Sequence, residues 1–245
     1  MNLYALIGYP LGHSFSKKYF TNKFETEGLE DCFFELFPLE KITQFPALLQ
    51  SHLSLKGLAV TIPYKQEVIP FLDEMSSEAK KIGAVNCIQI KEGKLKGFNT
   101  DVVGFEKSFV PLLASHHKKA LILGTGGASK AVQYILQKLQ IPFQTVSRRA
   151  NTAEEILSYA DVTENILKEY TIIINCTPLG MSPDVESRPA IPYQYITSEH
   201  YLYDLVYSPS ETAFLEQGKR QGAIVKNGYE MLLLQAEENW RIWND

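Results

Sequence analysis

The stretch KALILGTGGASKAVQYILQKL, residues 119–139, constrains the fold more than any other part of the chain. Its pattern predicts a short buried strand, a glycine-rich turn and an amphipathic helix in direct succession. Gly124 allows the tight turn, and Gly126 lets a phosphate group approach the backbone. The helix that begins near Gly127 and Ala128 offers free N–H groups and the positive end of its dipole to an anion. Together these features predict a dinucleotide-binding site in a Rossmann domain.

The glycine turn departs from the usual dinucleotide fingerprint at one position. Ser129 stands where a third glycine or an alanine is expected. A simpler interpretation stays open, in which the glycines serve only the geometry of a turn between strand and helix. The place of the turn, after a buried strand and before a long helix, favours the nucleotide site.

The choice of cofactor depends on the residues that follow the next strand. An NAD site needs a carboxylate roughly 20 residues beyond the turn to accept hydrogen bonds from the ribose. This chain has Ser147, Arg148 and Arg149 there, with no acid. Guanidinium groups bind a 2′-phosphate through planar, charge-assisted hydrogen bonds, so the sequence predicts NADP(H) over NAD(H). The alternative is a pair of solvated arginines in a loop.

Apolar runs alternate with helical patterns in both halves of the chain, which indicates βα units and the α/β class. Strands are predicted at 3–8, 32–38, 57–62, 142–148, 171–177, 200–207 and 223–228, besides the one before the glycine turn. A hairpin is predicted over 84–101, with its turn at Glu92 and Gly93. Helices are predicted at 16–27, 42–53, 64–73 and 102–113, after the glycine turn, and from about 229 onward. The sequence thus predicts a domain over residues 1–101 with a mainly parallel sheet and a Rossmann domain over 102–228. The helix at 229–245 could pack on either.

Composition excludes several classes of function. The net charge is −4, from 24 Lys and Arg against 28 Asp and Glu, so no overall basic field indicates a nucleic-acid partner. No apolar stretch approaches the roughly 20 residues that span a bilayer, and the N-terminus has no signal-peptide pattern. The three cysteines are widely spaced and odd in number, as in a protein of the reducing cytoplasm. The histidines show no metal-ligand spacing, so no metal is expected.

Polar residues follow the predicted strands of the first domain, where open parallel sheets place their ligands. They are Ser14 and Ser16 in GYPLGHSFS, Thr61 and Lys65 in VTIPYK, Asn86 in GAVN, and Asp101 in GFNTD. Taken singly, Lys65 could be a solvated lysine, Asp101 a helix cap and Asn86 a turn residue. Taken together, hydroxyl, amide, ammonium and carboxylate groups indicate a pocket for a small polyhydroxylated acid.

Ordered motifs along almost the whole chain resemble one known family. They are GYPLGHSFS (8–16), VTIPYK (60–65), GAVN (83–86), GFNTDVVG (97–104), GTGGASKA (124–131), NCTPLGM (175–181), DLVYSP-ET (204–212) and NGYEMLLLQA (227–236). With these motifs the sequence is similar to the shikimate dehydrogenases, the shikimate/quinate dehydrogenase family.

This resemblance implies an NADP-linked, reversible reduction of 3-dehydroshikimate to shikimate in aromatic amino-acid biosynthesis. It implies a cleft between two α/β domains, with the helix at 229–245 joined to the first domain. It also assigns roles to matching positions, by which Lys65 and Asp101 are the catalytic pair. Ser14 and Ser16 hold the substrate carboxylate, Thr61, Asn86, Asp101 and Gln235 bind ring hydroxyls, Tyr207 lies near the substrate, Arg148 binds the 2′-phosphate, and Thr177, Gly228 and Met231 contact the cofactor. Family members are commonly monomers or homodimers.

The chain also departs from the family pattern. Lys17 replaces a proline, Thr21 a histidine and Ser147 an asparagine. The largest departure is Ala59, since the family motif GxNVTxPxK has there an asparagine that faces the substrate. This change keeps two alternatives open: a quinate/shikimate dehydrogenase of relaxed specificity, and a weakly active ligand-binding paralogue.

Overall fold

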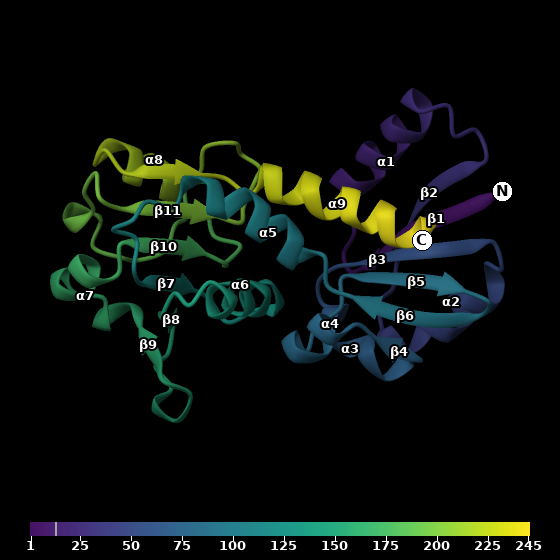
Figure 1. Ribbon diagram of the computed structural model, residues 1–245, viewed down its shortest axis with the longest axis horizontal. Coiled ribbons are helices and arrows are strands. Elements are labelled where there is room, and N and C mark those ends of the chain that lie inside the picture. The colour runs from purple at the N-terminus through teal and green to yellow at the C-terminus, as the bar shows by residue number, and fades with distance from the viewer. Residues whose placement is uncertain (13) are drawn as a thin grey trace. The chain divides into compact units, whose positions relative to one another are not determined.

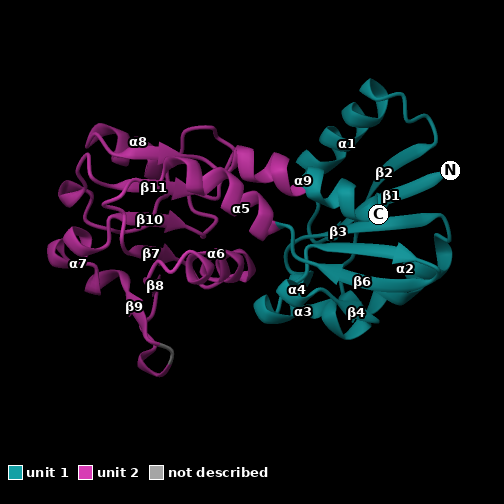
Figure 2. Cartoon of the chain, viewed as in Figure 1, with its two compact units in different colours: residues 1–100, 236–245 teal, residues 101–235 magenta. Residues whose placement is uncertain are grey.

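The computed structural model describes residues 1–12 and 14–245, so His13 of the GYPLGHSFS motif lies outside the described residues. As described, the chain divides into two compact units (Figure 2). The first comprises residues 1–100 with 236–245, and the second comprises residues 101–235. Both units are α/β, with a sheet between layers of helices (Figure 1).

The first unit alternates strands and helices along residues 1–100. Its strands are β1 (Asn2–Gly8), β2 (Cys32–Pro38), β3 (Leu55–Val60), β4 (Glu74–Met75), β5 (Cys87–Lys91) and β6 (Lys94–Phe98). Its helices are α1 (Phe15–Thr26), η1 (Ile42–Gln44), α2 (Phe45–Ser51), α3 (Tyr64–Glu67), η2 (Ile69–Phe71) and α4 (Ser77–Ile82). The predicted strand at 57–62 ends at Val60, and the predicted helix at 64–73 is a short α-helix followed by a 3-10 turn.

The strands of the first unit pair in the order β2-β1-β3-β5-β6-β4. Strand β1 is parallel to β2 and β3, whereas β5 pairs antiparallel with β3 and with β6. The hairpin between β5 and β6 turns at Glu92 and Gly93, as predicted, and both residues have positive φ. Such φ values suit the tight turns that match the twist of antiparallel strands.

Alternating side chains of β1 divide the core of the first unit between the two faces of its sheet. Leu3, Ala5 and Ile7 pack with residues of α2, α3 and α4. Tyr4 and Leu6 face the other way, into an aromatic cluster with α1 and α9 (Tyr229–Asn244). Helix α9 contributes its residues from 236 onward to this unit and residues 229–235 to the second unit.

The second unit begins with α5 (Asp101–Phe109). Its other helices are η3 (Val110–Leu112), α6 (Gly127–Lys138), η4 (Thr152–Glu154), η5 (Tyr159–Asp161), α7 (Glu164–Glu169), η6 (Tyr193–Tyr195) and α8 (Ala213–Arg220). Its strands are β7 (Ala120–Leu123), β8 (Phe143–Ser147), β9 (Ile156–Ser158), β10 (Ile172–Asn175), β11 (Tyr201–Asp204) and β12 (Ile224–Lys226). Strand β9 and helices α7 and α8 were not predicted from the sequence.

The strands of the second unit are parallel throughout their described pairings, in the order β12-β11-β10-β7-β8-β9. Numbered within the unit, this is the order 6-5-4-1-2-3 of a Rossmann sheet. The order reverses between β7 and β10, and ligands of such sheets bind beyond the carboxyl ends of the strands at that point. Helices α5 and α6 cover one face of this sheet, and α7 and α8 the other (Figure 1).

Candidate functional site

The start of helix α1 carries the predicted serine pair. Ser14 is the N-cap, and its side-chain oxygen accepts a hydrogen bond from the Lys17 backbone N–H at 3.3 Å. The Ser14 O–H can still be donated, and Ser16 lies half-buried in the first turn. The Lys17 ammonium, where the family has proline, pairs with Glu35 of β2 at 2.6 Å. Hydroxyl groups and first-turn N–H groups at this point suit a small carboxylate.

The segment after β3 holds Thr61 and Lys65 at the carboxyl end of that strand. The Thr61 backbone N–H donates to Ile7 of β1 at 2.9 Å, and the Thr61 carbonyl accepts from Tyr64 at 2.9 Å. Lys65 lies half-buried in α3, and its carbonyl accepts from the backbone of Val85 at 2.7 Å. The backbone bonds on either side therefore fix the path of the chain that carries both side chains.

Asn86 belongs to a buried polar network within the first unit. Its Oδ1 accepts from the Thr100 backbone N–H at 2.7 Å, and its Nδ2 donates to Thr100 Oγ1 at 3.0 Å. The Thr100 hydroxyl donates to Asn239 Oδ1 of α9 at 2.6 Å. All three residues are at most 3% exposed. Because Asp101 follows Thr100 directly, this network fixes the chain immediately before the predicted catalytic aspartate.

Thr100 and Asn239 were not predicted as site residues. Thr100 lies inside the GFNTD motif, which is a local signal for it. Asn239 interrupts the apolar face of a terminal helix, but its partner lies far away in the sequence and is known only from the fold.

Ala59 lies in the apolar interior of the first unit. It is 6% exposed and belongs to the aromatic cluster with Tyr4, Phe20 and Trp243. A Cβ on nearby Gly57 would come within 2.3 Å of the Trp243 ring, so the aromatic packing here is close. In this chain, position 59 carries a methyl group that matches its apolar surroundings.

The glycine turn lies at the carboxyl end of β7, as predicted. Gly124 has φ +108°, and a Cβ there would come within 2.9 Å of Thr177 Cγ2. Gly126 is the N-cap of α6, and a Cβ there would meet no atom within 4 Å. With no cap side chain, the start of α6 at Gly127 and Ala128 is open to a phosphate group. This open glycine cap fits the pyrophosphate of a dinucleotide.

Ser129, which breaks the glycine fingerprint, has a local role. It is 1% exposed, and its hydroxyl donates to the Gly126 carbonyl at 2.6 Å. The serine therefore closes the first turn of α6 from inside, in the place of the small residue that the fingerprint expects.

The predicted phosphate-binding residues lie at the end of β8, next to β7 in the sheet. Ser147 is the last residue of β8, and Arg148 and Arg149 are exposed. Burial raises the pKa of Tyr159, and the charge of Arg148 lowers it in part. The guanidinium of Arg148 is therefore close enough to influence Tyr159. Exposed arginines at this strand end suit a 2′-phosphate.

Two loops and the start of α9 place further predicted cofactor and substrate residues. The backbone N–H and hydroxyl of Thr177 donate to Asn175 Oδ1 at 3.0 and 2.6 Å. Gly228 donates to the Val206 carbonyl at 3.1 Å, and a Cβ there would lie 2.2 Å from the Leu205 carbonyl oxygen. Only glycine fits at position 228 without moving the backbone. Next to this contact, Tyr207 is half-buried, which raises its pKa.

Helices α5 and α9 approach each other closely within the second unit. A Cβ on Gly104 would lie 2.5 Å from the Met231 carbonyl oxygen and 3.2 Å from Gln235 Cβ. Asp101, 6% exposed, begins α5 one turn before Gly104. The glycine therefore sets the spacing of the helices that carry Asp101 and Gln235. It was not predicted as a site residue, although a glycine inside a helix is a visible signal.

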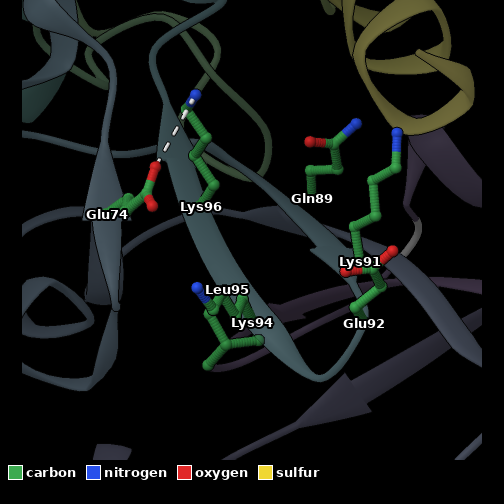
Figure 3. Close-up of a pocket in the computed structure, with 7 residues that line it drawn as sticks. All are labelled: Glu74, Gln89, Lys91, Glu92, Lys94, Leu95 and Lys96. Carbon is green, nitrogen blue, oxygen red and sulfur yellow. Dashed lines mark ion pairs between the residues drawn. The ribbon is translucent and has the colours of Figure 1, made fainter.

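A surface pocket of about 260 Å³ lies elsewhere in the first unit, on the β5–β6 hairpin (Figure 3). It is lined by Glu74, Gln89, Lys91, Glu92, Lys94, Leu95 and Lys96. Lys91 donates to the carbonyl oxygen of Asp245 at 3.0 Å, and Lys96 lies 3.8 Å from Glu74. The pocket contains none of the predicted site residues.

The predicted residues are distributed over both units. The first unit holds Ser14, Ser16, Thr61, Lys65 and Asn86, and the second holds Asp101, Tyr207, Gln235 and the predicted cofactor residues. Among residues 1–12 and 14–245, no cluster of three or more His, Cys, Asp or Glu could hold a metal ion. No helix in that same part of the chain has the length and apolar character needed to cross a membrane.

Comparisons with known proteins identify the family of the chain. Residues 6–88 match the family model of the shikimate dehydrogenase substrate binding domain. The chain is 37% identical to the shikimate dehydrogenase (NADP(+)) of Carboxydothermus hydrogenoformans, over 97% of this chain and 91% of that protein. Among solved structures it is similar to the shikimate 5-dehydrogenase of Thermus thermophilus in complex with NADP(H) and shikimate, with a TM-score of 0.87, 31% identity and coverage of 99% and 93%. It is also similar to quinate dehydrogenase from Corynebacterium glutamicum in complex with NAD, with a TM-score of 0.86, 26% identity and coverage of 99% and 93%. The chain belongs to the shikimate dehydrogenase family.

Proposed function

We propose that the chain catalyses the NADP-linked, reversible reduction of 3-dehydroshikimate to shikimate. The observation that carries this proposal is a series of backbone and side-chain bonds between the segments that hold Lys65 and Asp101. The Lys65 carbonyl accepts from the Val85 N–H, and Asn86, the next residue, is bonded to Thr100. Asp101 follows Thr100 directly. The match over nearly the full chain to enzymes named for this reaction supports the same assignment.

The second unit would hold the cofactor. The open cap at Gly126 and the first turn of α6 receive the pyrophosphate, and Ser147, Arg148 and Arg149 bind the 2′-phosphate. Thr177, Gly228 and Met231 line the nicotinamide side. When bound, the nicotinamide supplies or accepts the hydride, and the protein supplies binding, orientation and charge.

The first unit and α5 would handle the substrate. Reduction of a carbonyl group leaves negative charge on its oxygen, and Lys65 donates a proton to that oxygen. Asp101 orients the lysine and a substrate hydroxyl. Such acid catalysis contributes roughly 10²–10⁴-fold in rate. The substrate carboxylate binds Ser14 and Ser16, and the hydroxyl groups of the substrate ring bind Thr61, Asn86 and Gln235. Tyr207 lies near the substrate.

Ala59 is the observation that favours a second candidate function. An apolar residue at this position supports a quinate/shikimate dehydrogenase of relaxed specificity, and the likeness to a quinate dehydrogenase agrees with it. A weakly active ligand-binding paralogue is the remaining alternative. We place the enzyme in the cytoplasm, since Cys32, Cys87 and Cys176 are free thiols, and propose a monomer or homodimer.

The test measures reduction of NADP+ and of NAD+ with shikimate and with quinate. We expect turnover with shikimate and NADP+ that falls by roughly two to four orders of magnitude in Lys65→Ala, with NADP+ affinity retained. Lys80→Ala, at an exposed lysine of α4, is the matched control and should keep parental turnover. Turnover with quinate as well as with shikimate would favour the second candidate, and binding without turnover of either acid would favour the paralogue.

A separate pair of variants tests the cofactor assignment. Arg148→Ala and Arg149→Ala each remove charge-assisted hydrogen bonds to the 2′-phosphate. The KM for NADP+ should rise by roughly 10- to 100-fold in at least one of the two variants. The KM for NAD+, which lacks the phosphate, should stay unchanged. An equal rise for both cofactors would contradict a phosphate-binding role.

A further inference from the structure

Asp204 is a buried carboxylate that the proposed reaction leaves without a role. It is the last residue of β11 and is fully buried. Burial raises its pKa to about 6, and hydrogen bonds from Thr212, Val206 and Asn175 oppose that shift. A carboxylate is costly to bury unless its oxygens accept hydrogen bonds, so these three donors make the buried charge tolerable.

Each oxygen of the Asp204 carboxylate has a defined donor. Oδ1 accepts from Asn175 Nδ2 at 2.9 Å and from the Val206 backbone N–H at 3.0 Å. Oδ2 accepts from the Thr212 hydroxyl at 2.5 Å. Thr212 is itself the buried N-cap of α8, and its oxygen accepts from Leu215 N–H at 3.3 Å. The carboxylate thus joins the ends of β10 and β11 to the start of α8.

These bonds fix the orientation of the Asn175 amide. Because Nδ2 faces Asp204, Oδ1 faces the following loop and accepts both the backbone N–H and the hydroxyl of Thr177. Thr177 Oγ1 in turn accepts from Leu179 N–H at 3.3 Å. The Thr177 methyl lies over the glycine turn, where a Cβ on Gly124 would be 2.9 Å away. The loop after β10 is therefore held against the cofactor turn through Asp204.

The same carboxylate fixes the loop after β11. Val206 donates its N–H to Asp204, and its carbonyl accepts from Gly228 at 3.1 Å, at the start of α9. Leu205 donates to the Asn175 carbonyl at 3.0 Å. Two loops and one helix start at the carboxyl edge of the Rossmann sheet therefore depend on one buried acceptor.

We propose that Asp204 is a positioning residue for the cofactor, acting through Asn175 and Thr212 to hold the loops at Thr177 and Val206 beside the glycine turn. This inference rests on the proposed function, because it concerns NADP(H) binding. A carboxylate is required because its donors bind a charged oxygen more strongly than a neutral one. An amide or a protonated carboxyl could keep the contacts, but with weaker bonds.

The proposal predicts a pH dependence of cofactor affinity. As the pH falls through about 6, Asp204 gains a proton, its charge-assisted bonds weaken, and the KM for NADP+ rises. The other titratable groups that act on the carboxylate, or on which it acts, are Cys176, Tyr193 and Tyr203. Their pKa values are all raised by burial, so these groups keep their protons near pH 6.

The test uses Asp204→Asn and Thr212→Val, with Thr212→Ser as the conservative variant that keeps the hydroxyl. Ser108→Ala is the matched control, since Ser108 makes a buried hydrogen bond of 2.6 Å to Tyr203, and its other hydrogen bonds go to carbonyl groups of its own helix, α5. The dissociation constant of NADP+ is measured by calorimetry without substrate, and kcat and both KM values are measured between about pH 5.5 and 8.

We expect the dissociation constant and the KM for NADP+ to rise roughly 5- to 30-fold in Asp204→Asn and Thr212→Val. The kcat should fall less than this, and Thr212→Ser and Ser108→Ala should remain near the parent. The rise of the KM below about pH 6 should be smaller in Asp204→Asn than in the parent, because only the titration of the cofactor's 2′-phosphate, with a pKa of about 6, remains in the variant.

Parental NADP+ affinity in folded Asp204→Asn and Thr212→Val would overturn the proposal. So would a lowered melting temperature without a change in affinity, or an unchanged pH profile in Asp204→Asn. If the parent binds NADP+ in an Asp204-dependent way but does not oxidise shikimate, the proposed function fails and this inference stands. If the parent is active and the variants match it, this inference alone fails.

Discussion

Replacing Ala59 with asparagine would restore the residue that the family motif carries, and the structure predicts that this change harms the protein. The side chain at position 59 is 6% exposed and packs in the cluster that contains Tyr4, Phe20 and Trp243. Apart from the thiol of Cys87, which is a weak hydrogen-bonding partner, the buried members of this cluster offer an amide only the Tyr4 hydroxyl and the Trp243 indole N–H. Those two groups are already bonded to Asn244 and to the Ile88 carbonyl.

The expected cost has two parts. An amide buried without hydrogen bonds costs about 1–3 kcal/mol, and three extra heavy atoms in a close-packed cluster cost about 1–3 kcal/mol. The free energy of unfolding should therefore fall by about 2–6 kcal/mol. For a chain of this size, that corresponds to a melting temperature lower by roughly 5–20 °C. Ala59→Leu adds similar volume without the amide, so it should show only the packing part.

Thermal unfolding followed by circular dichroism measures the loss, and steady-state oxidation of shikimate measures the effect on activity. We expect Ala59→Asn to melt below Ala59→Leu and Ala59→Leu below the parent, with no gain in turnover. A melting temperature of Ala59→Asn equal to that of the parent, together with higher turnover, would refute this reasoning. It would show that position 59 faces the substrate and that alanine is a lesion there.

Three further predictions follow from contacts described above. Gly228→Ala should lower the melting temperature and weaken NADP+ binding, because its Cβ would lie 2.2 Å from a backbone oxygen. Gly126→Ala, with open space around its Cβ, should keep the melting temperature and weaken only NADP+ binding. Equal melting temperatures of the two variants would contradict this. Thr100→Val should cost about 1–3 kcal/mol in urea unfolding, because it breaks the hydroxyl's bonds to Asn86 and Asn239, and Thr100→Ser should recover most of that loss. Burial lowers the pKa of His117 and of His200, so below about pH 6.5 the unfolded chain binds more protons and stability declines as the pH falls. The raised pKa of Asp204 acts in the opposite direction between about pH 6 and pH 4. Urea unfolding at about pH 7.5 and about pH 5.5 should differ less in His117→Asn than in the parent, and an unchanged difference would exclude His117 as a cause.

Local patterns predicted the parts of the fold that depend on neighbouring residues. The turn at Gly124 was evident because glycine, an apolar run and an amphipathic helix occur together within residues 119–139. The hairpin turn at Glu92 and Gly93 was equally local. Strand β4, two residues long, was missed because it exists only through its pairing with β6, and no sequence pattern of that length is specific.

In the candidate site, too, the sequence predicted individual residues but not the contacts between residues that are distant in sequence. Lys65 and Asp101 were predicted from motifs, and their joint role remains a prediction. The environment of Ala59 could not be predicted, because it is formed by Trp243 and other residues distant in sequence. Asp204 had a visible signal, a charged residue inside the apolar run YLYDLVY, but its function depends on Thr212 and Asn175, which only tertiary structure brings to it.

The division of helix α9 between the units has a consequence for biosynthesis. Residues 236–245 complete the first unit, and within them Trp243 packs over Gly57 and donates to the Ile88 carbonyl at 3.1 Å. A ribosome makes these residues only after all of residues 101–235. Domains usually fold from the N-terminus during synthesis, but here the contiguous second unit can finish first. Until Trp243 emerges, the aromatic cluster of the first unit has the side chains of α1 on it but lacks those of α9, so this unit cannot complete its core before the end of α9 is made.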